Sequence, residues 1–321
     1  MDDRNPHRKI RRSLLLAGST LALAPRLAFS QGKYPSRPVE FIVPWGPGGG
    51  ADQLARALSQ LLEPELGVSM PILNIPGATG NTGMAKLLSS PPDGHSLALF
   101  IGDTLGTLAG GKGRYQLSDL APVGVMIRQP TGLFVKQDAK WKNFDELLAD
   151  SKKNDIKAGI TGFGSPDEMH VNKFNDKGSK FRPVPFAKPG ERYSSILGGH
   201  ADVLLEQAGD VKSFLDSKQM RPILSFAEQP QVGYEDIPLA SKYGVDFNIS
   251  QFRSVVMRAG TDPAHVKAMS AAMSKAANSE QFKKYLRDQL AFADSFIPAE
   301  KAGAFIAQQL QLIEANLPKK A

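Results

Sequence analysis

Apolar and polar residues alternate along the chain with two different periodicities. Short runs of large and β-branched apolar residues predict strands at 39–43, 70–74, 97–101, 123–127 and 133–135. Between these runs, apolar residues at spacings of three and four predict helices, as at 51–66 and 84–90. Because strands and helices alternate, the pattern favours an α/β fold with mostly parallel sheets.

The second half of the chain continues this alternation. Strands are predicted at 156–160, 182–186, 202–205, 221–225 and 254–257. Asn143 is the expected N-cap of a helix that reaches residue 153. From residue 263 the pattern is helical to the end, with expected helices at 264–278, 281–289 and 299–316. The length suggests two domains, and the absence of a long linker indicates that strand-like segments join them.

The first 30 residues have the pattern of a secretory signal. A basic stretch at 8–12 precedes an apolar stretch at 14–24, and the small residues Ala28 and Ser30 favour cleavage after Ser30. The apolar stretch is shorter than the roughly 20 residues of a membrane span, so we expect release into a bacterial periplasm. Arg11 and Arg12 resemble a twin-arginine signal, and this route and the general export route both stay open.

The charge of the chain changes meaning when this segment is removed. The 321 residues contain 39 Lys and Arg against 32 Asp and Glu, a net charge of +7 that could suit a nucleic-acid binder. Six of those basic and two of those acidic residues lie in 1–30, which leaves 33 against 30, a net charge of +3. We therefore expect no nucleic-acid partner. The sequence has no cysteine, which excludes disulfides, thiolate metal sites and a lipid-attachment cysteine, so we expect no membrane anchor.

Three predicted strands each lead into a glycine-rich loop and then a helix. These loops lie at 46–50, 77–83 and 162–165. A helix N-terminus offers unpaired N–H groups and partial positive charge, and glycine lets a ligand approach the backbone closely. The first two loops can converge on one carboxylate, and the third can face them from a second domain. In the third, Ser165 is the expected N-cap and Pro166 the first helical residue.

Other motifs do not support an enzyme. Gly46, Gly48 and Ala51 fit a dinucleotide-binding spacing, but the next strand ends at Asn74 without the acidic residue that would bind a ribose. The sequence contains no G-x-S-x-G and no H-x-x-x-H or H-E-x-x-H. We therefore expect no catalytic residue, no cofactor and no metal. An exported enzyme that acts on a small carboxylic acid is the alternative.

Two polar residues near the loops have competing interpretations. Asp52 lies just inside the first helix and could cap the loop or contact the ligand through water, and Arg56 is expected to form an i,i+4 ion pair with it. His170 follows the third loop and is expected to be a core residue or to brace that loop.

These residues also resemble a known family. The segments 34–56, 66–67, 74–83 and 92–97 resemble, in order and spacing, the solute receptors of tripartite tricarboxylate transporters, the Bug-type receptors. Weaker similarity continues at 162–165 with His170, and at 184–186, 198–203 and 259–261. The resemblance therefore spans the whole chain after the signal segment.

The resemblance implies a type II periplasmic-binding fold whose two α/β domains close over a small organic acid. The implied domains are 31–134 with 254–321, and 135–253. The implied function is to bind a mono-, di- or tricarboxylate and to hand it to two integral-membrane permease subunits, as a monomer. A receptor used for signalling would need the same site and a different membrane partner.

The chain departs from the family pattern near the second domain. The family's Val-Pro-Tyr-Lys-Gly is replaced at 184–188, where Phe186 stands for the tyrosine, and the family's Trp-x-Gly becomes Phe252-Arg253-Ser254. Arg258 stands for a usual proline, and Asp262 is added before Pro263. Arg253 could pair with a second carboxylate or lie on the surface. Phe163, Phe186 and Phe252 could flank an aromatic ligand, but core packing is expected for each.

The expected ligand-binding residues combine the loops with the ends of neighbouring strands. They are Trp45, Gly46, Gly48, Gly49, Asp52, Ala78, Thr79, Gly80, Asn81, Thr104, Gly162, Phe163, Gly164, Ser165, Phe186, Glu206 and Arg253.

Overall fold

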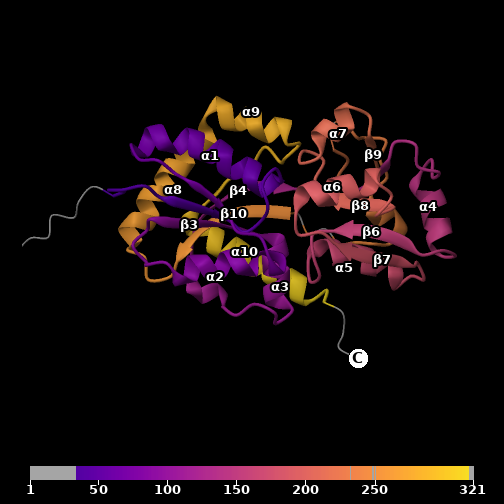
Figure 1. Ribbon diagram of the computed structural model, residues 1–321, viewed down its shortest axis with the longest axis horizontal. Helices are drawn as coiled ribbons and strands as arrows, with labels where there is room; N and C mark the ends of the chain where they lie inside the picture. The colour runs from indigo at the N-terminus through magenta and orange to yellow at the C-terminus, as the bar shows by residue number, and fades with distance from the viewer. Residues whose placement is uncertain (1–33, 232, 248, 250, 318–321) are drawn as a thin grey trace, which may run out of the picture. The chain divides into compact units, whose positions relative to one another are not determined.

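The computed structural model describes residues 34–317 except 232, 248 and 250, and arranges them around two β-sheets (Figure 1). From Pro35 onward they belong to one compact unit. We call the described residues of 35–129 and 251–317 the large lobe, and those of 132–247 the small lobe. The predicted signal segment, 1–30, lies outside the described residues.

The large lobe is built on a six-stranded sheet with the order β11-β4-β10-β3-β1-β2. Its strands are β1 (Glu40–Val43), β2 (Ile72–Asn74), β3 (Ser96–Ile101), β4 (Leu120–Gln129), β10 (Gln251–Arg258) and β11 (Ile297–Pro298). Helices α1 (Gly50–Leu66), α8 (Pro263–Asn278) and α9 (Glu280–Asp288) cover one face (Figure 1). The other face is covered by α2 (Asn81–Ser89), α3 (Gly102–Ala109) and α10 (Ala299–Glu314). Two short 3-10 helices are η2 (Ala78–Gly80) and η3 (Leu117–Asp119).

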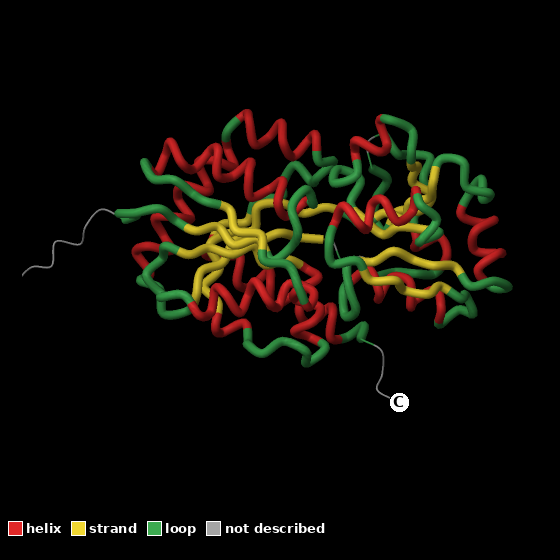
Figure 2. The backbone as a smooth tube through the Cα atoms, viewed as in Figure 1, coloured by secondary structure: helices red, strands yellow, loops and turns green. Residues whose placement is uncertain are grey.

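The small lobe is built on a five-stranded sheet with the order β7-β6-β8-β5-β9. Its strands are β5 (Gly132–Lys136), β6 (Ile156–Ile160), β7 (Phe181–Pro185), β8 (Val203–Glu206) and β9 (Met220–Ser225). Figure 2 shows helices on both sides of these strands as well. They are α4 (Phe144–Ser151), α5 (Pro166–Asn175), α6 (Pro189–Leu197), α7 (Lys212–Asp216) and the 3-10 helix η4 (Ala240–Tyr243).

The chain passes between the lobes on its strands. β4 ends at Gln129 in the large sheet, and β5 begins at Gly132 in the small sheet. β10 brings the chain back into the large sheet. The expected strand-like crossing is confirmed here, since only two residues separate β4 from β5.

Each sheet mixes parallel and antiparallel strands, which corrects the expectation of mostly parallel sheets. β1 runs parallel to β2 and β3, and β6 runs parallel to β7 and β8. By contrast, β10 is antiparallel to β3 and β4, and β5 is antiparallel to β8 and β9. In each sheet a strand at a crossing between the lobes, β10 in the large sheet and β5 in the small sheet, runs against the strands of the βαβ units. The α/β class itself is confirmed.

Two of the predicted helix starts are confirmed in detail. The backbone N–H of Glu146 donates to Asn143 Oδ1 at 3.0 Å, and that of Glu168 donates to Ser165 Oγ at 3.4 Å. Pro166 is the first residue of α5, where its missing N–H costs nothing. Both caps satisfy N–H groups that the first helical turn leaves unpaired.

Two elements differ from the expected pattern. Helix α3 was not predicted, because its glycines and threonines have low helix propensity. The C-terminal segment is not helical throughout, since β11 pairs with β4 through Ile297 and Val125. No helix among the described residues is long and apolar enough to cross a membrane.

His170 is a core residue of the small lobe, as expected. Its side chain is fully buried, its ring centroid lies 4.0 Å from that of Phe226, and its Nε2 lies 3.1 Å from the backbone oxygen of Phe247. Burial disfavours the charged imidazolium and lowers the pKa of His170 to about 3. The folded protein therefore holds this histidine neutral.

Acid should destabilise the protein through His170. Its contribution is fully present above the unfolded-state pKa of roughly 6.5 and is lost as the pH falls toward 3, because only the unfolded chain takes up the proton. Between pH 7.5 and 4.5 we expect a loss of about 3 kcal/mol in the free energy of unfolding from this group. Urea denaturation of the wild type and His170→Gln at both pH values measures it. An equal loss in both proteins would contradict the assignment.

Candidate functional site

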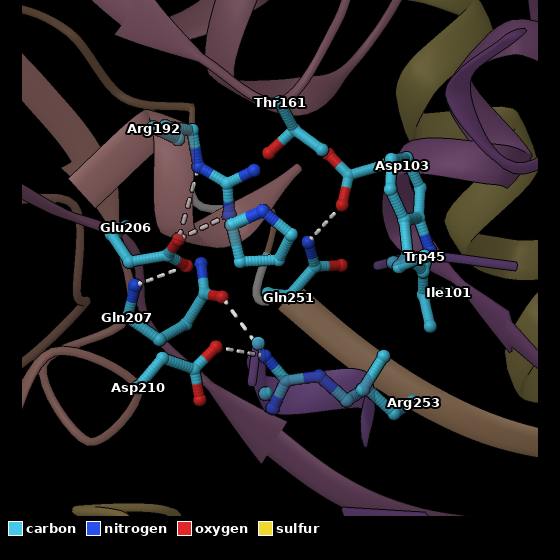
Figure 3. A pocket seen from close by; sticks show the side chains of 14 residues that line it. Trp45, Ile101, Asp103, Thr161, Arg192, Glu206, Gln207, Asp210, Gln251 and Arg253 are labelled. Carbon is cyan, nitrogen blue, oxygen red and sulfur yellow. Dashed lines mark hydrogen bonds and ion pairs between the residues drawn. The ribbon is translucent and has the colours of Figure 1, made fainter. Parts of the chain in front are cut away.

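A cavity lies between the two lobes, at the carboxyl ends of several strands. Its walls come from the start of α1, from residues that follow β3 and β8, from α6 and from β10 (Figure 3). The cavity encloses about 30 Å³. Sites for small molecules usually enclose about 300–1,000 Å³, so this one is closed tightly by its own side chains. The residues that line it are Trp45, Gly49, Gly50, Ala51, Ile101, Asp103, Thr161, Pro189, Arg192, Glu206, Gln207, Asp210, Gln251 and Arg253.

Arg253 connects the lobes across this cavity. It lies on β10 in the large sheet and is 3% exposed. Its Nη2 donates to Gln207 Oε1 at 3.2 Å and forms an ion pair with Asp210, both in the small lobe after β8. Its Nη1 donates to Gln129 of β4. The alternative of a surface position for Arg253 is wrong, because strand alternation turns it inward on the side opposite to Phe252.

The acidic groups around Arg253 favour its charged form. Burial on its own would lower the pKa of this guanidinium, but Asp210, together with Tyr285, Glu206 and Tyr193, outweighs burial and raises the pKa. A buried ion pair of this kind contributes little net stability, but removing one partner leaves the other charge buried and costs about 3–5 kcal/mol.

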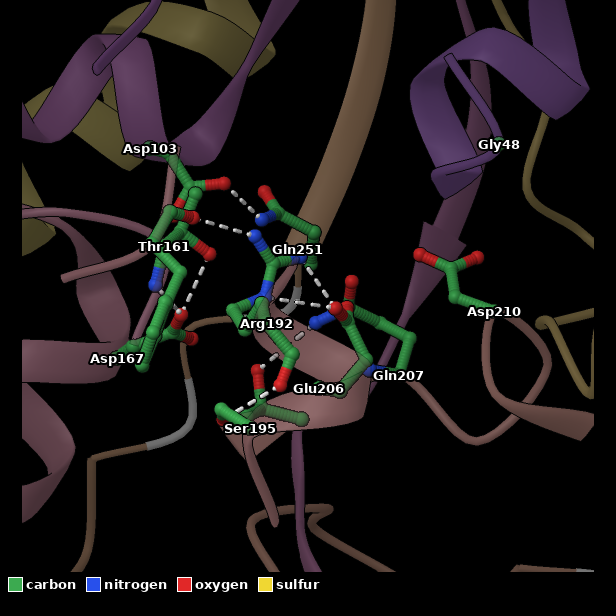
Figure 4. Close-up of polar contacts among 12 residues, drawn as sticks. Gly48, Asp103, Thr161, Asp167, Arg192, Ser195, Glu206, Gln207, Asp210 and Gln251 are labelled. Carbon is green, nitrogen blue, oxygen red and sulfur yellow. Dashed lines mark hydrogen bonds and ion pairs between the residues drawn. The ribbon is translucent and has the colours of Figure 1, made fainter. Parts of the chain in front are cut away.

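A second buried ion pair lies within the small lobe. Arg192 of α6 donates from Nε and Nη2 to Glu206 Oε2, and from Nη1 to the backbone oxygen of Phe186 at 3.2 Å. The other carboxylate oxygen of Glu206 accepts from the backbone N–H of Gln207 at 3.0 Å. Figure 4 draws this pair together with the hydrogen-bonded side chains of Gln251 and Asp103. Both guanidinium groups at the cavity are therefore already paired with carboxylates.

Asp103 forms no ion pair with either of these arginines. It is the second residue of α3 and is 1% exposed. Its Oδ2 accepts from Gln251 Nε2 at 2.5 Å, and the other amide atom of Gln251 accepts from the backbone N–H of Gly102 at 3.0 Å. Burial, and after it the nearby carboxyl group of Asp167, raises the pKa of Asp103 to about 8.

Asp167 lies behind the cavity wall. Its Oδ2 accepts from the backbone N–H of Thr161 at 3.0 Å and from Thr161 Oγ1 at 2.7 Å. Burial, and after it the nearby Glu206, raises the pKa of Asp167 to about 6. Asp167 therefore positions Thr161, and it adds negative potential near Asp103.

Asp52 braces the first glycine loop. Its Oδ2 accepts from the backbone N–H of Gly48 at 3.0 Å, and its Oδ1 accepts from Asn74 Nδ2 at 3.1 Å. The predicted ion pair with Arg56 is confirmed at 2.9 Å. Burial on its own would raise the pKa of Asp52, but these hydrogen bonds outweigh it and lower the pKa. Of its two interpretations, capping the loop is the one that these contacts support.

The lobes touch closely where glycines face each other across the gap. A Cβ atom on Gly106 of α3 would lie 2.2 Å from the backbone oxygen of Gly164 in the small lobe. A Cβ on Gly49 would lie 2.4 Å from Cγ of Pro189, and one on Gly162 would lie 2.4 Å from Oγ1 of Thr79. A Cβ on Gly106 would meet backbone and would prevent the observed approach of the lobes, whereas Thr79 could turn its side chain away from a Cβ on Gly162.

The structure brings only part of the predicted set to the cavity. Trp45, Gly49, Glu206 and Arg253 line it. The other predicted residues are not among those that line it: Gly46, Gly48, Asp52, Ala78, Thr79, Gly80, Asn81, Thr104, Gly162, Phe163, Gly164, Ser165 and Phe186. The second and third loops meet each other through Thr79 and Gly162, beside the cavity.

The three phenylalanines behave differently from one another. Phe252 is fully buried and its ring packs against that of Phe305 at a centroid distance of 5.3 Å, which confirms the expected core position. Phe186 is half-buried. Phe163 is 49% exposed at the tip of the third loop, so the expectation of core packing is wrong there.

Sequence reasoning missed several residues that line the cavity. They are Asp103, Thr161, Arg192, Gln207, Asp210 and Gln251. The sequence pattern could have identified most of them, because polar residues directly follow the apolar runs of β3 and β8. Gln251 and Arg253 alternate with the buried Phe252 on β10, which places both on one face. Arg192 lies inside a helix and carries no such signal.

Comparisons with known proteins agree with this architecture. Residues 54–315 match the family described as tripartite tricarboxylate transporter family receptor. Protein BugT of Bordetella pertussis is 26% identical over 311 residues, which cover 94% of this chain and 94% of BugT.

Solved structures show the same fold. The crystal structure of a TctC solute-binding protein from Polaromonas is 28% identical, with a TM-score of 0.64, and the match covers 89% of this chain and 100% of that chain. MatC of Rhodopseudomonas palustris, solved with bound malate, is 22% identical, with a TM-score of 0.81 and the same coverage. Since the family match extends over most of the chain, the protein belongs to the tripartite tricarboxylate transporter receptor family.

Proposed function

We propose that the protein is a non-catalytic periplasmic receptor that binds a small organic carboxylate between its lobes and delivers it to a membrane transporter. The main support is the position of Arg253 at the start of α1. A Cβ on Gly50 would lie 2.3 Å from Arg253 Nη2, so the guanidinium lies against the first turn of this helix. No side chain caps this end of α1, whose partial positive charge adds to that of Arg253.

The carboxylate of Asp210 occupies the position that we assign to a carboxylate of the ligand. The same Cβ would lie 2.1 Å from Asp210 Oδ2, so this carboxylate lies against the start of α1 together with the guanidinium of Arg253. We propose that a ligand carboxylate takes over this position and that Asp210 competes with it.

Ligand binding then requires the lobes to separate. A cavity of about 30 Å³ is much smaller than a usual ligand site. The bodies that we propose to move are the large lobe and the small lobe, which correspond to the expected domains 31–134 with 254–321 and 135–253 except for the first residues of β5 and β10. Their motion would bend the chain where β4 passes into β5 and where it returns to β10, as in other hinge closures.

We place the receptor in the periplasm, because the segment 1–30 has the pattern of an export signal. The permease subunits of a tripartite transporter are the proposed partners, on the strength of the family match. Cleavage after Ser30 would be seen in the mass of the exported protein.

A panel of carboxylates tests the proposal. The purified protein is heated with mono-, di- and tricarboxylates, including aromatic acids, at millimolar concentration. A ligand present at about 100 times its Kd should add about 2.7 kcal/mol to the free energy of unfolding and raise the Tm measurably. A panel in which no acid raises the Tm would contradict the proposed function.

Substitutions at the interlobe ion pair should change affinity in opposite directions. Asp210→Asn removes the competing carboxylate, so the best acid of the panel should bind about tenfold more tightly, as expected for a gain of about 1.4 kcal/mol. Adding Arg253→Gln to Asp210→Asn should abolish that gain and weaken binding below the wild type without leaving a buried unpaired charge. Calorimetric titration measures both, and Arg56→Gln, outside the cavity, serves as the control. Unchanged affinity in the double variant would argue against Arg253 as a ligand contact.

Closure itself can be tested at Gly106. Gly106→Ala should keep the lobes apart by a clash with Gly164 and weaken ligand binding about tenfold, since overpacking costs about 1–3 kcal/mol. Small-angle scattering with saturating ligand should show a larger radius of gyration than for the wild type. Gly190→Ala is the matched control, because a Cβ there meets no atom within 4 Å. Equal radii and affinities in both variants would contradict closure at this contact.

A further inference from the structure

The residues around the cavity carry more acidic than basic groups. Three carboxyl side chains line it, those of Asp103, Glu206 and Asp210, against two guanidinium groups, those of Arg192 and Arg253. Glu206 and Asp210 each form an ion pair with one of these arginines. Asp103 is therefore the carboxyl group of the lining that no arginine neutralises.

Asp103 is also incompletely hydrogen-bonded. The residue is 99% buried and lines the cavity, and its Oδ1 has no hydrogen-bond partner. Figure 3 shows its carboxyl group extending toward Gln251 at the centre of the pocket. A buried polar atom without a partner costs about 1–3 kcal/mol, and a buried charge without a counter-charge costs more. A ligand group that supplies both a donor and a positive charge would remove this cost.

Unpaired groups of both kinds line the same cavity. Trp45 Nε1 and Arg253 Nε are buried donors without acceptors, and Asp103 Oδ1 and Asp210 Oδ1 are buried acceptors without donors. A ligand with carboxylates alone could satisfy the donors, but it would bring like charge to Asp103. A ligand that carries both signs of charge could satisfy the donors and the acceptors together.

We propose that the ligand is an amino acid or a similar zwitterion, whose ammonium group binds Asp103 while its carboxylate binds Arg253 and the start of α1. This inference rests on the proposed function, of which it specifies the class of ligand.

The surroundings of Asp103 favour a cationic partner over a neutral one. The charged groups that face it are Asp167 of α5, Glu206 of β8 and Arg192 of α6, and the amide of Gln251 donates to it. Burial and the negative charge of Asp167 raise the pKa of Asp103 to about 8, so the protein groups around it disfavour an ionised carboxylate. A ligand ammonium would lower this cost by charge and by a hydrogen bond, whereas a ligand hydroxyl would supply the hydrogen bond alone.

Matched acids distinguish these possibilities. Each series keeps one carbon skeleton and changes C2 from ammonium to hydroxyl to hydrogen: alanine, lactate and propionate; aspartate, malate and succinate; glutamate, 2-hydroxyglutarate and glutarate. Calorimetric titration of the full mature protein at pH 7 measures their affinities. We expect the ammonium member of the best series to bind at least tenfold more tightly than its hydroxyl and hydrogen counterparts.

The variant Asp103→Asn tests the residue itself. It keeps the shape and the hydrogen bond with Gln251 but removes the charge, so the ammonium member should lose at least tenfold in affinity while the hydrogen member binds equally well or better. Asp288→Asn, on the exposed face of α9, should change neither affinity. Circular dichroism checks that Asp103→Asn is folded, and the wild-type series is informative without any variant.

These experiments distinguish a failure of the inference from a failure of the proposed function. If the hydroxyl or hydrogen members bind as tightly as the ammonium members, or if Asp103→Asn keeps the full preference for ammonium, the inference is overturned and the carboxylate receptor stands. If no acid of any class binds, in these series or in the wider panel, the proposed function fails together with the inference.

Discussion

Arg253 is buried between the two lobes, and its guanidinium needs negative partners because a buried unpaired charge costs several kcal/mol. Asp210 supplies the negative charge from the small lobe, and the amide oxygens of Gln207 and Gln129 accept further hydrogen bonds from the small and the large lobe. The side chain of Arg253 thereby links β10, which carries it, to β4 and to the segment that follows β8. The packing of the lobes around the cavity, and its small volume, follow from this requirement.

The predictable part of the molecule is the part governed by local pattern. The strand and helix periods, the N-caps Asn143 and Ser165, and the glycine loops after strands all depend on neighbours in sequence, and the structure contains them. Asp52 was recognised for the same reason, because Arg56 is four residues away on its helix.

The cavity could be predicted only in part, because it depends on distant segments. Arg192 and Glu206 are 14 residues apart, and Asp210 and Arg253 are 43 apart. No periodicity relates such residues. The pairing of Asp210 with Arg253 depends on which strands the chain uses to cross between the sheets, and the antiparallel crossing strands were not evident from the βαβ pattern. Helix α3, which carries Asp103, was missed because its glycines and threonines resemble a loop.

The glycines at the lobe contact have a consequence for kinetics. Where the backbones of Gly106 and Gly164 meet, the gap leaves no room for a side chain. In the proposed binding mode a bound molecule is released when the lobes part, so the rate of parting sets the rate of release. Its residence time would then depend on contacts that never touch it, such as the pair of Asp210 and Arg253. A membrane partner that pulls on either lobe could shorten that time without entering the cavity, and affinity and release could be tuned by different residues.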